Sequence, residues 1–209
     1  MSVLDQLACA LGRRDEVPNR ELAHRLAGAE DRAGVRELAG NLGNKDRAIR
    51  FDCIKVLYEV GYVKPELVAP YALDFLKLLK SRENRLVWGA ALALSTVGAL
   101  AAEELFPRWE EIRKAMDGGS VITRDAGVLA LAGIASTAAE RRAVLFLYLL
   151  EHLRTCRPKD VAQHSEKTLP AVDAGNAAAF VAVLEKRMED LQGAQVKRVE
   201  KVIRQAKEK

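Results

Sequence analysis

Residues 46–61, DRAIRFDCIKVLYEVG, decide the fold of this 209-residue chain, because their pattern returns twice at an interval of 37 residues. The second copy is ENRLVWGAALALSTVG at residues 83–98, and the third is SVITRDAGVLALAGIA at residues 120–135. Within each copy, apolar or small residues recur at the spacing of one helix face. A period of this length predicts stacked helical hairpins that bury their apolar faces against one another.

Two columns of equivalent positions describe how the copies pack. The first column is small in every copy, at Cys53, Ala90 and Gly127. The second holds a leucine in every copy, at Leu57, Leu94 and Leu131. Small side chains let neighbouring helices approach closely, and leucines fill the space beside them. We therefore assign both columns to the core and give them no further role.

The rest of the sequence completes the prediction of an all-α protein with few aromatic residues, at 5%. Further helices are expected at about 3–11, 19–27, 31–42, 65–80, 103–116, 139–155, 177–191 and 195–207, and Pro158 opens one more. Residues 1–209 are expected to form one solenoid domain. Its parts are N-terminal capping helices at 1–30, about four repeats at 31–172 and C-terminal capping helices at 173–209.

Glycine and proline give expectations about where helices end or bend. Gly61 is expected to end the first patterned helix, because glycine readily takes the left-handed conformation that closes helices. Ser120, after two glycines, is a good N-cap for the third. Pro70 and Pro107 lie 37 residues apart, early in the helices expected at 65–80 and 103–116. A proline in the first turn of a helix is tolerated, whereas a proline beyond the first turn bends the helix.

The net charge of +4 comes from the C-terminal segment. Residues 197–209 contain six lysines and arginines against two glutamates, whereas the preceding residues carry 27 charges of each sign. This segment predicts an amphipathic helix with one apolar face, at Val196, Val199, Val202 and Ile203. A terminal capping helix with a solvated outer face explains this basic charge. The alternative is a binding site for an anionic partner.

Cysteine usage and hydropathy indicate a cytoplasmic protein. Cys9, Cys53 and Cys156 lie far apart and show no metal-type pairing, which favours a reducing compartment. Asp5 precedes the short apolar run near the N-terminus, where a secretion signal needs positive charge. No apolar stretch is long enough to span a membrane, so no membrane association is expected.

Several short motifs resemble HEAT-like, armadillo-type helical repeats over roughly residues 31–172. The outer-helix motifs are Leu67-Val68-Ala69-Pro70 and Leu105-Phe106-Pro107, and the inner-helix motif joins Asp46 and Ile49-Arg50 to Leu57 and Val60-Gly61. The resemblance implies a right-handed α-α superhelix. It also implies a ladder between an acid column, here Asp46, Glu83 and Ser120, and an arginine column, here Arg50, Val87 and Arg124. Val87 interrupts that ladder, so we expect it to have a modest structural role.

The inner helices also present residues that point away from the core. At 100° per residue, the positions opposite the core direction form a mainly apolar strip in place of a polar solvated face. The candidate partner-binding residues are Arg47, Phe51, Lys55, Tyr58, Trp88, Leu92 and Leu129. An exposed apolar strip marks a contact site for a protein partner or a second copy of the chain. The alternative is that the N-terminal helices or neighbouring repeats cover it.

The leading functional hypothesis is a non-enzymatic protein-binding scaffold, without catalytic residues, cofactor or metal. The alternative is a nucleic-acid-binding protein related in fold to the HEAT-like alkylpurine DNA glycosylases. Against that alternative, the chain shows no tryptophan pair beside an aspartate, because Trp88 and Trp109 belong to different helix layers. A body of balanced charge also suits phosphate contacts poorly, so nucleic acid is not expected as a partner.

Metal or hydrolytic chemistry is the third hypothesis. His152 and Cys156 are four residues apart on an expected helix and could reach one ion, with His164 beyond the turn. A structural zinc site uses four ligands, and no second pair is visible, which favours ordinary helix-end residues. The sequence contains no glycine-rich phosphate loop, nucleophile elbow or zincin motif.

Overall fold

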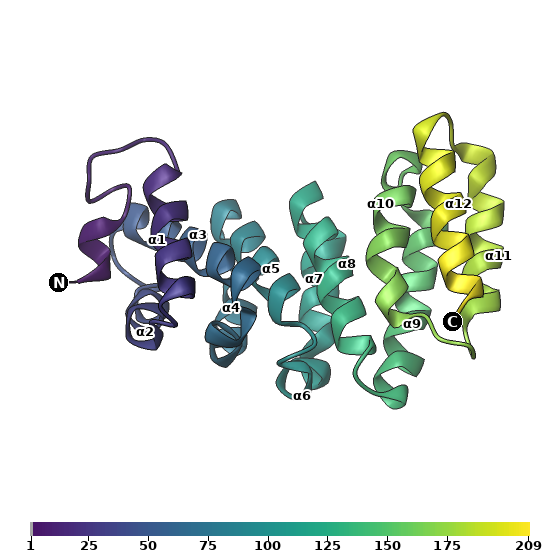
Figure 1. The fold of residues 1–209 in the computed structure, drawn as a ribbon, viewed down its shortest axis with the longest axis horizontal. Coiled ribbons are helices and arrows are strands. Elements are labelled where there is room, and N and C mark those ends of the chain that lie inside the picture. Colours follow the sequence, from purple (N-terminus) through teal and green to yellow (C-terminus); the bar gives the residue numbers. More distant parts are fainter. Residues whose placement is uncertain (1) are drawn as a thin grey trace. The chain divides into compact units, whose positions relative to one another are not determined.

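The computed structural model describes residues 2–209, and every regular element in that range is a helix (Figure 1). The chain divides into two compact units, Met1–Gly127 and Val128–Lys209, with the boundary inside helix α8 (Val121–Ala135). None of the helices in residues 2–209 could span a membrane. The expected all-α fold is confirmed.

The first unit is a series of short helices in which α3 is central, since it packs against α1, α2 and α5 (Figure 1). The three copies of the repeated pattern form α3, α5 and α8. The α-helices of this unit before α8 are α1 (Val17–Gly28), α2 (Arg32–Gly40), α3 (Arg47–Val63), α4 (Ala72–Leu78), α5 (Asn84–Val97), α6 (Ala102–Leu105) and α7 (Trp109–Gly118). The helix expected at 3–11 is only a 3-10 turn, η1 (Val3–Gln6).

Side-chain caps explain where several of these helices begin. Asp31 accepts a hydrogen bond from the Gly34 N–H (2.8 Å) at the start of α2. Asp46 accepts one from the Ala48 N–H (2.8 Å) at the start of α3. Ser120 accepts one from the Thr123 N–H (3.2 Å), as expected of a cap for α8. Each cap satisfies an amide that has no partner inside the helix.

The small and leucine columns lie in the core, as expected. Cys53, Ala90, Leu57, Leu94 and Leu131 are fully buried. Gly127 is buried too, and a Cβ atom there would collide with the Met116 side chain. The ladder has one rung here, an ion pair of 2.7 Å between Arg50 of the first copy and Glu83 of the second.

Gly61 does not end its helix, so that expectation was wrong. Helix α3 continues through Gly61 to Val63. Gly61 is buried in helical conformation, and a Cβ atom there would collide with the hydroxyl of Thr96 on α5. The glycine serves close helix packing and not helix termination.

The outer helices expected at 65–80 and 103–116 are broken. Pro70 lies in the 3-10 turn η3 (Ala69–Tyr71), after η2 (Pro65–Leu67) and before α4. Pro107 lies in η4 (Phe106–Arg108), between α6 and α7. A proline inside a helix lacks the amide donor and clashes with the preceding turn, which here breaks both helices at the equivalent place.

The second unit consists of the end of α8 and four further α-helices. Helix α12 packs against α10 and α11, and α9 packs against the same two helices. The apolar face expected on the last helix is buried at Val199, Val202 and Ile203, with Val196 half-buried. The elements are α9 (Ala139–Thr155), α10 (Pro158–Thr168), η5 (Leu169–Ala171), α11 (Ala177–Arg187), η6 (Met188–Asp190) and α12 (Ala194–Lys207).

Candidate protein-binding site

The candidate partner-binding residues lie on three helices. Helix α3 carries Arg47, Phe51, Lys55 and Tyr58, helix α5 carries Trp88 and Leu92, and Leu129 lies in the part of α8 that belongs to the second unit. Arg47 is exposed, and Phe51, Trp88, Leu92 and Leu129 are half-buried. Lys55 and Tyr58 are buried. The accessible part of the strip in the first unit therefore centres on Phe51 and Trp88.

Two guanidinium groups flank the Phe51 ring. Arg47 Cζ lies 4.8 Å from the ring centroid, and Arg85 Cζ lies 5.2 Å from it. Cation–π contacts of this kind hold an arginine in a defined place on an aromatic surface. Sequence reasoning missed Arg85, because its contact with Phe51 joins α5 to α3 and appears only when the helices pack.

Lys55 is the centre of a network of ion pairs. Its ammonium group contacts Glu59 at 2.7 Å and Glu16 at 2.9 Å, and Glu16 also contacts Arg85 at 2.9 Å. Burial alone would lower the pKa of Lys55, but hydrogen bonds to Glu59, Tyr58 and Glu16 outweigh it and raise the pKa above its ordinary value. The segment before α1 thus reaches α3 and α5 through Glu16.

Three aromatic rings follow one another from α3 to α5. The ring centroid of Tyr58 lies 5.9 Å from that of Tyr62 in an edge-to-face arrangement and 6.2 Å from that of Trp88. Tyr62 is 54% exposed. Sequence reasoning missed Tyr62 because it placed the helix end at Gly61, although Tyr62 lies one turn after Tyr58 on the same face.

We call the surface formed by six of these residues the α3–α5 aromatic face. Its charges are largely balanced. Arg47 pairs with Glu83 at 2.9 Å, Arg85 pairs with Glu16, and both arginines stack on Phe51. The face combines aromatic area with guanidinium groups, which are the side chains enriched at the centres of protein interfaces. Its residues are Arg47, Phe51, Tyr58, Tyr62, Arg85 and Trp88.

The second unit holds a separate cluster with metal-ligating chemistry. One ligand atom each from His152, Cys156 and His164 lies within 4.8 Å of the other two. The sequence indicated that the first two share a helix face. It also pointed to His164 beyond the turn, whose distance from the other two depends on how α10 packs against α9.

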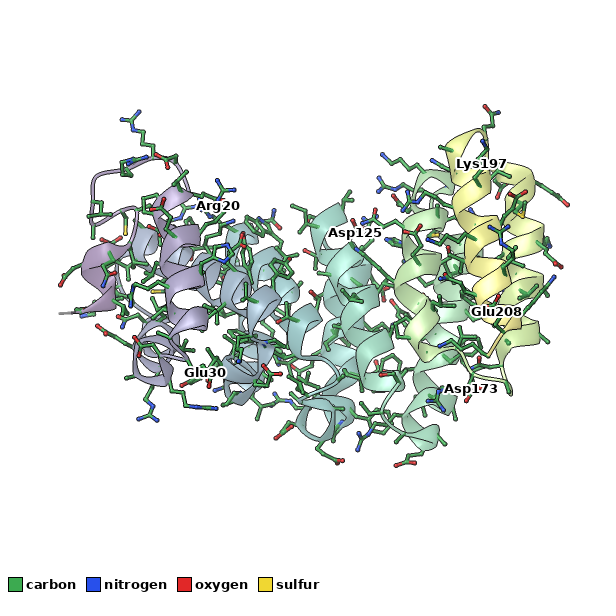
Figure 2. All side chains as sticks on the ribbon, viewed as in Figure 1. Arg20, Glu30, Asp125, Asp173, Lys197 and Glu208 are labelled. Atoms are coloured by element: carbon green, nitrogen blue, oxygen red, sulfur yellow. The ribbon has the colours of Figure 1, made fainter. Side chains whose placement is uncertain are left out.

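The basic C-terminal segment has internal partners. Arg198 makes two hydrogen bonds to Glu166 on α10, of 2.8 and 2.6 Å, and Lys207 pairs with Glu185 on α11 at 3.3 Å. Figure 2 shows Lys197 near the start of α12 and Glu208 just after its end. These pairs fit the interpretation of α12 as a packed terminal helix with a charged outer face.

Comparison with known proteins relates the chain to solved repeat structures. No family model matches it, and no curated protein does. A crystal structure of an engineered protein from the Northeast Structural Genomics Consortium is 18% identical, with a TM-score of 0.69 over 100% of this chain and 98% of that one. A designed armadillo repeat protein in complex with the peptide (KR)4 is 16% identical, with a TM-score of 0.68 over 90% and 85%. Another designed armadillo repeat protein is 13% identical, with a TM-score of 0.66 over 97% and 99%. The chain therefore has the armadillo-type, HEAT-like helical-repeat fold.

Proposed function

We propose that this chain is a non-enzymatic scaffold that binds a segment of another protein on the α3–α5 aromatic face. The observation that carries this proposal is the accessible aromatic area at Phe51, Tyr62 and Trp88, bordered by two guanidinium groups. Aromatic rings offer large contact area at a low cost in side-chain entropy, and arginine adds directional hydrogen bonds. The similarity in fold to a designed protein in complex with a peptide is compatible with such a role.

The chemistry of the face defines the segment that fits it. An apolar side chain of the partner would cover the rings of Phe51 and Trp88. A carboxylate beside it would accept a hydrogen bond from Arg47, whose side chain is 69% exposed and already held over Phe51. The free thiols at Cys9, Cys53 and Cys156 support our further proposal that the chain works in the reducing cytoplasm.

Peptide selection tests the proposal directly. Peptides enriched from a random display library on the native protein would be labelled, and their affinities measured by fluorescence anisotropy. We expect Phe51→Ala and Trp88→Ala each to weaken binding by at least about tenfold, because centrally placed aromatic residues dominate such interfaces. Leu147→Ala is the matched control, since Leu147 is a 66% exposed apolar residue on α9 in the other unit.

The outcomes separate the possible occupants. Peptides that bind folded Phe51→Ala and Trp88→Ala as tightly as the native protein would overturn the proposal, as would a library that yields no saturable binder. Molar mass by light scattering gives the second measurement. A native dimer that becomes a monomer in the Phe51→Ala variant would identify a second copy of the chain as the occupant of the same face. Circular dichroism would confirm that each variant remains helical.

A further inference from the structure

The end of helix α9 and the middle of helix α10 bring together two imidazoles and a thiol. Nε2 of His152 lies 3.0 Å from Nδ1 of His164. The Cys156 sulfur completes the cluster, in which no two of the ligand atoms are more than 4.8 Å apart. His164 is buried, and His152 and Cys156 are half-buried. The cluster lies entirely within the second unit.

The local sequence explains this convergence. His152 lies in the last turn of α9, and Cys156, four residues later, is the C-cap whose backbone N–H donates to the His152 carbonyl oxygen (2.8 Å). Helix α9 ends at Thr155 and α10 begins at Pro158, so the two helices form a tight hairpin. The side of α10 that packs on α9 then presents His164 to both residues.

The separation of the two ring nitrogens is close to that required by a tetrahedral metal ion. Zinc–nitrogen bonds of about 2.0–2.1 Å and zinc–sulfur bonds of about 2.3 Å place neighbouring ligand atoms about 3.3–3.6 Å apart in a tetrahedron. The two ring nitrogens, at 3.0 Å, are already close to that separation. The sulfur atom lies within 4.8 Å of both nitrogens, so it would have to approach them by up to about 1 Å.

The turn that carries Cys156 is held in place by Arg187 on α11. The guanidinium group donates hydrogen bonds to the carbonyl oxygens of Leu153 (2.6 Å), Arg154 (2.8 Å) and Cys156 (2.9 Å). Burial raises the pKa of the Cys156 thiol, while the nearby Arg187 charge acts in the opposite direction. Asp160, which pairs with Arg157 at 2.6 Å, supplies a negative charge on the same side. The hydrogen bonds from Arg187 thus fix the turn that carries the Cys156 thiol.

We propose that His152, Cys156 and His164 bind one divalent transition-metal ion of the zinc class. Two imidazoles and one thiolate are the borderline ligands that such ions prefer. The cluster found among residues 2–209 has three ligands, so the fourth coordination position is left for water or for a donor atom from a bound partner. Binding releases the thiol proton to solvent as the sulfur–metal bond forms.

Cobalt and zinc titrations of the full chain test the site. We expect one equivalent of Co²⁺ to give visible d–d bands together with a thiolate-to-cobalt charge-transfer band, and Zn²⁺ to displace it. Cys156→Ser should abolish the charge-transfer band and weaken zinc binding by at least about 100-fold, because it removes the thiolate ligand. His152→Gln should weaken binding to a similar degree, and it avoids altering the buried His164.

The chain supplies a matched control. It contains three histidines, of which the site uses two, and three cysteines, of which the site uses one. The triple variant His24→Ala, Cys9→Ser, Cys53→Ser removes all the others, which lie in the first unit, and should bind Co²⁺ and Zn²⁺ as the native protein does. Absence of saturable binding by the folded native chain would overturn the proposal. So would binding that survives in Cys156→Ser or is lost in the triple variant with its helicity intact.

Discussion

Arg187 donates a hydrogen bond to the carbonyl oxygen of Cys156 over 2.9 Å, and it binds the carbonyls of Leu153 and Arg154 as well. A residue of α11 therefore caps the C-terminus of α9. The last carbonyls of a helix have no donors inside it, and their partial negative charge favours a cation. Arg187 is 8% exposed, so most of its side chain is shielded from water where it binds these carbonyls.

Replacing Arg187 by methionine should therefore destabilise the second unit. We expect the free energy of unfolding to fall by about 2–4 kcal/mol, because one buried hydrogen bond and two partly buried ones to backbone carbonyls are lost while the apolar volume is retained. The stability of Arg187→Lys should lie between those of the native protein and Arg187→Met, since an ammonium group cannot reach all three acceptors at once. Urea denaturation followed by circular dichroism measures the change. Lys186→Met, at the exposed neighbouring position, should alter stability little, and an equal loss in both methionine variants would contradict this account.

The contact between Gly61 and Thr96 predicts a second effect. Gly61→Ala should destabilise the first unit by about 1–3 kcal/mol, because its Cβ atom would overlap the Thr96 hydroxyl in a packed core. Away from such a contact the same change favours a helix. Gly118→Ala is the control, since nothing lies within 4 Å of a Cβ atom at Gly118.

A double-mutant cycle checks the cause of the Gly61 effect. Thr96→Ala removes the overlapping hydroxyl, so it should recover most of the stability that Gly61→Ala loses. Thermal unfolding of the four proteins gives the coupling free energy directly. Additive effects of the two substitutions would show that the loss arises elsewhere in the helix pair.

Lys55 predicts a dependence of stability on alkaline pH. Its pKa in the folded protein lies above the ordinary 10.5, because its hydrogen bonds to carboxylates outweigh its burial. Its contribution to stability is therefore complete below pH 10.5 and is lost as the pH rises toward the folded-state pKa. The free energy of unfolding of the native protein should exceed that of Lys55→Met by about 1–3 kcal/mol near pH 8. This difference should shrink toward pH 11.

Urea denaturation of both proteins across this pH range measures the difference. Lys77→Met provides the comparison, because Lys77 pairs with Asp74 on the exposed surface, where such pairs contribute little. A difference between native protein and Lys55→Met that stays constant up to about pH 11 would exclude the ammonium group as its source.

The nucleic-acid alternative makes a distinct prediction. Because Arg198 and Lys207 on α12 already pair with glutamates, we expect no binding of labelled single- or double-stranded DNA by anisotropy at about 0.1 M salt. Saturable DNA binding that weakens steeply with salt and disappears in Lys197→Gln, Lys201→Gln would favour the alternative function. Leu147→Ala serves again as the unchanged control.

The repeated pattern was enough to predict the fold, because core columns such as Cys53, Ala90 and Gly127 impose the same packing wherever they recur. It was not enough to predict local breaks. Gly61 is compatible with either a helix end or a close helix contact, and only the presence of Thr96 decides between them. Pro70 and Pro107 were recognised, but their depth in the helices depended on where each helix began.

Burial and contacts of individual side chains in the candidate sites could not be predicted from the sequence either. Helical periodicity placed Phe51, Tyr58 and Trp88 outside the core direction, yet it could not show that Tyr58 is buried among its neighbours. Arg85 belongs to the face through its contact with Phe51, 34 residues away in sequence, and it pairs with Glu16, 69 residues away. The contact between His164 and His152 also depends on how two helices pack. The periodicity of a single helix does not contain that information.

The close helix contacts of the first unit have a consequence for how such a chain can change in length. Helices α3 and α5 occupy equivalent positions one period apart, and each buries the same succession of small residue and leucine. Duplicating the 37 residues from Asn84 to Ser120 would therefore present each new helix with a surface it already matches. Insertion of a whole period keeps the small and leucine columns in register, whereas insertion of a few residues would rotate these columns away from the neighbouring helix. Evolution can thus add whole 37-residue repeats to this chain more readily than it can insert or delete residues within one repeat.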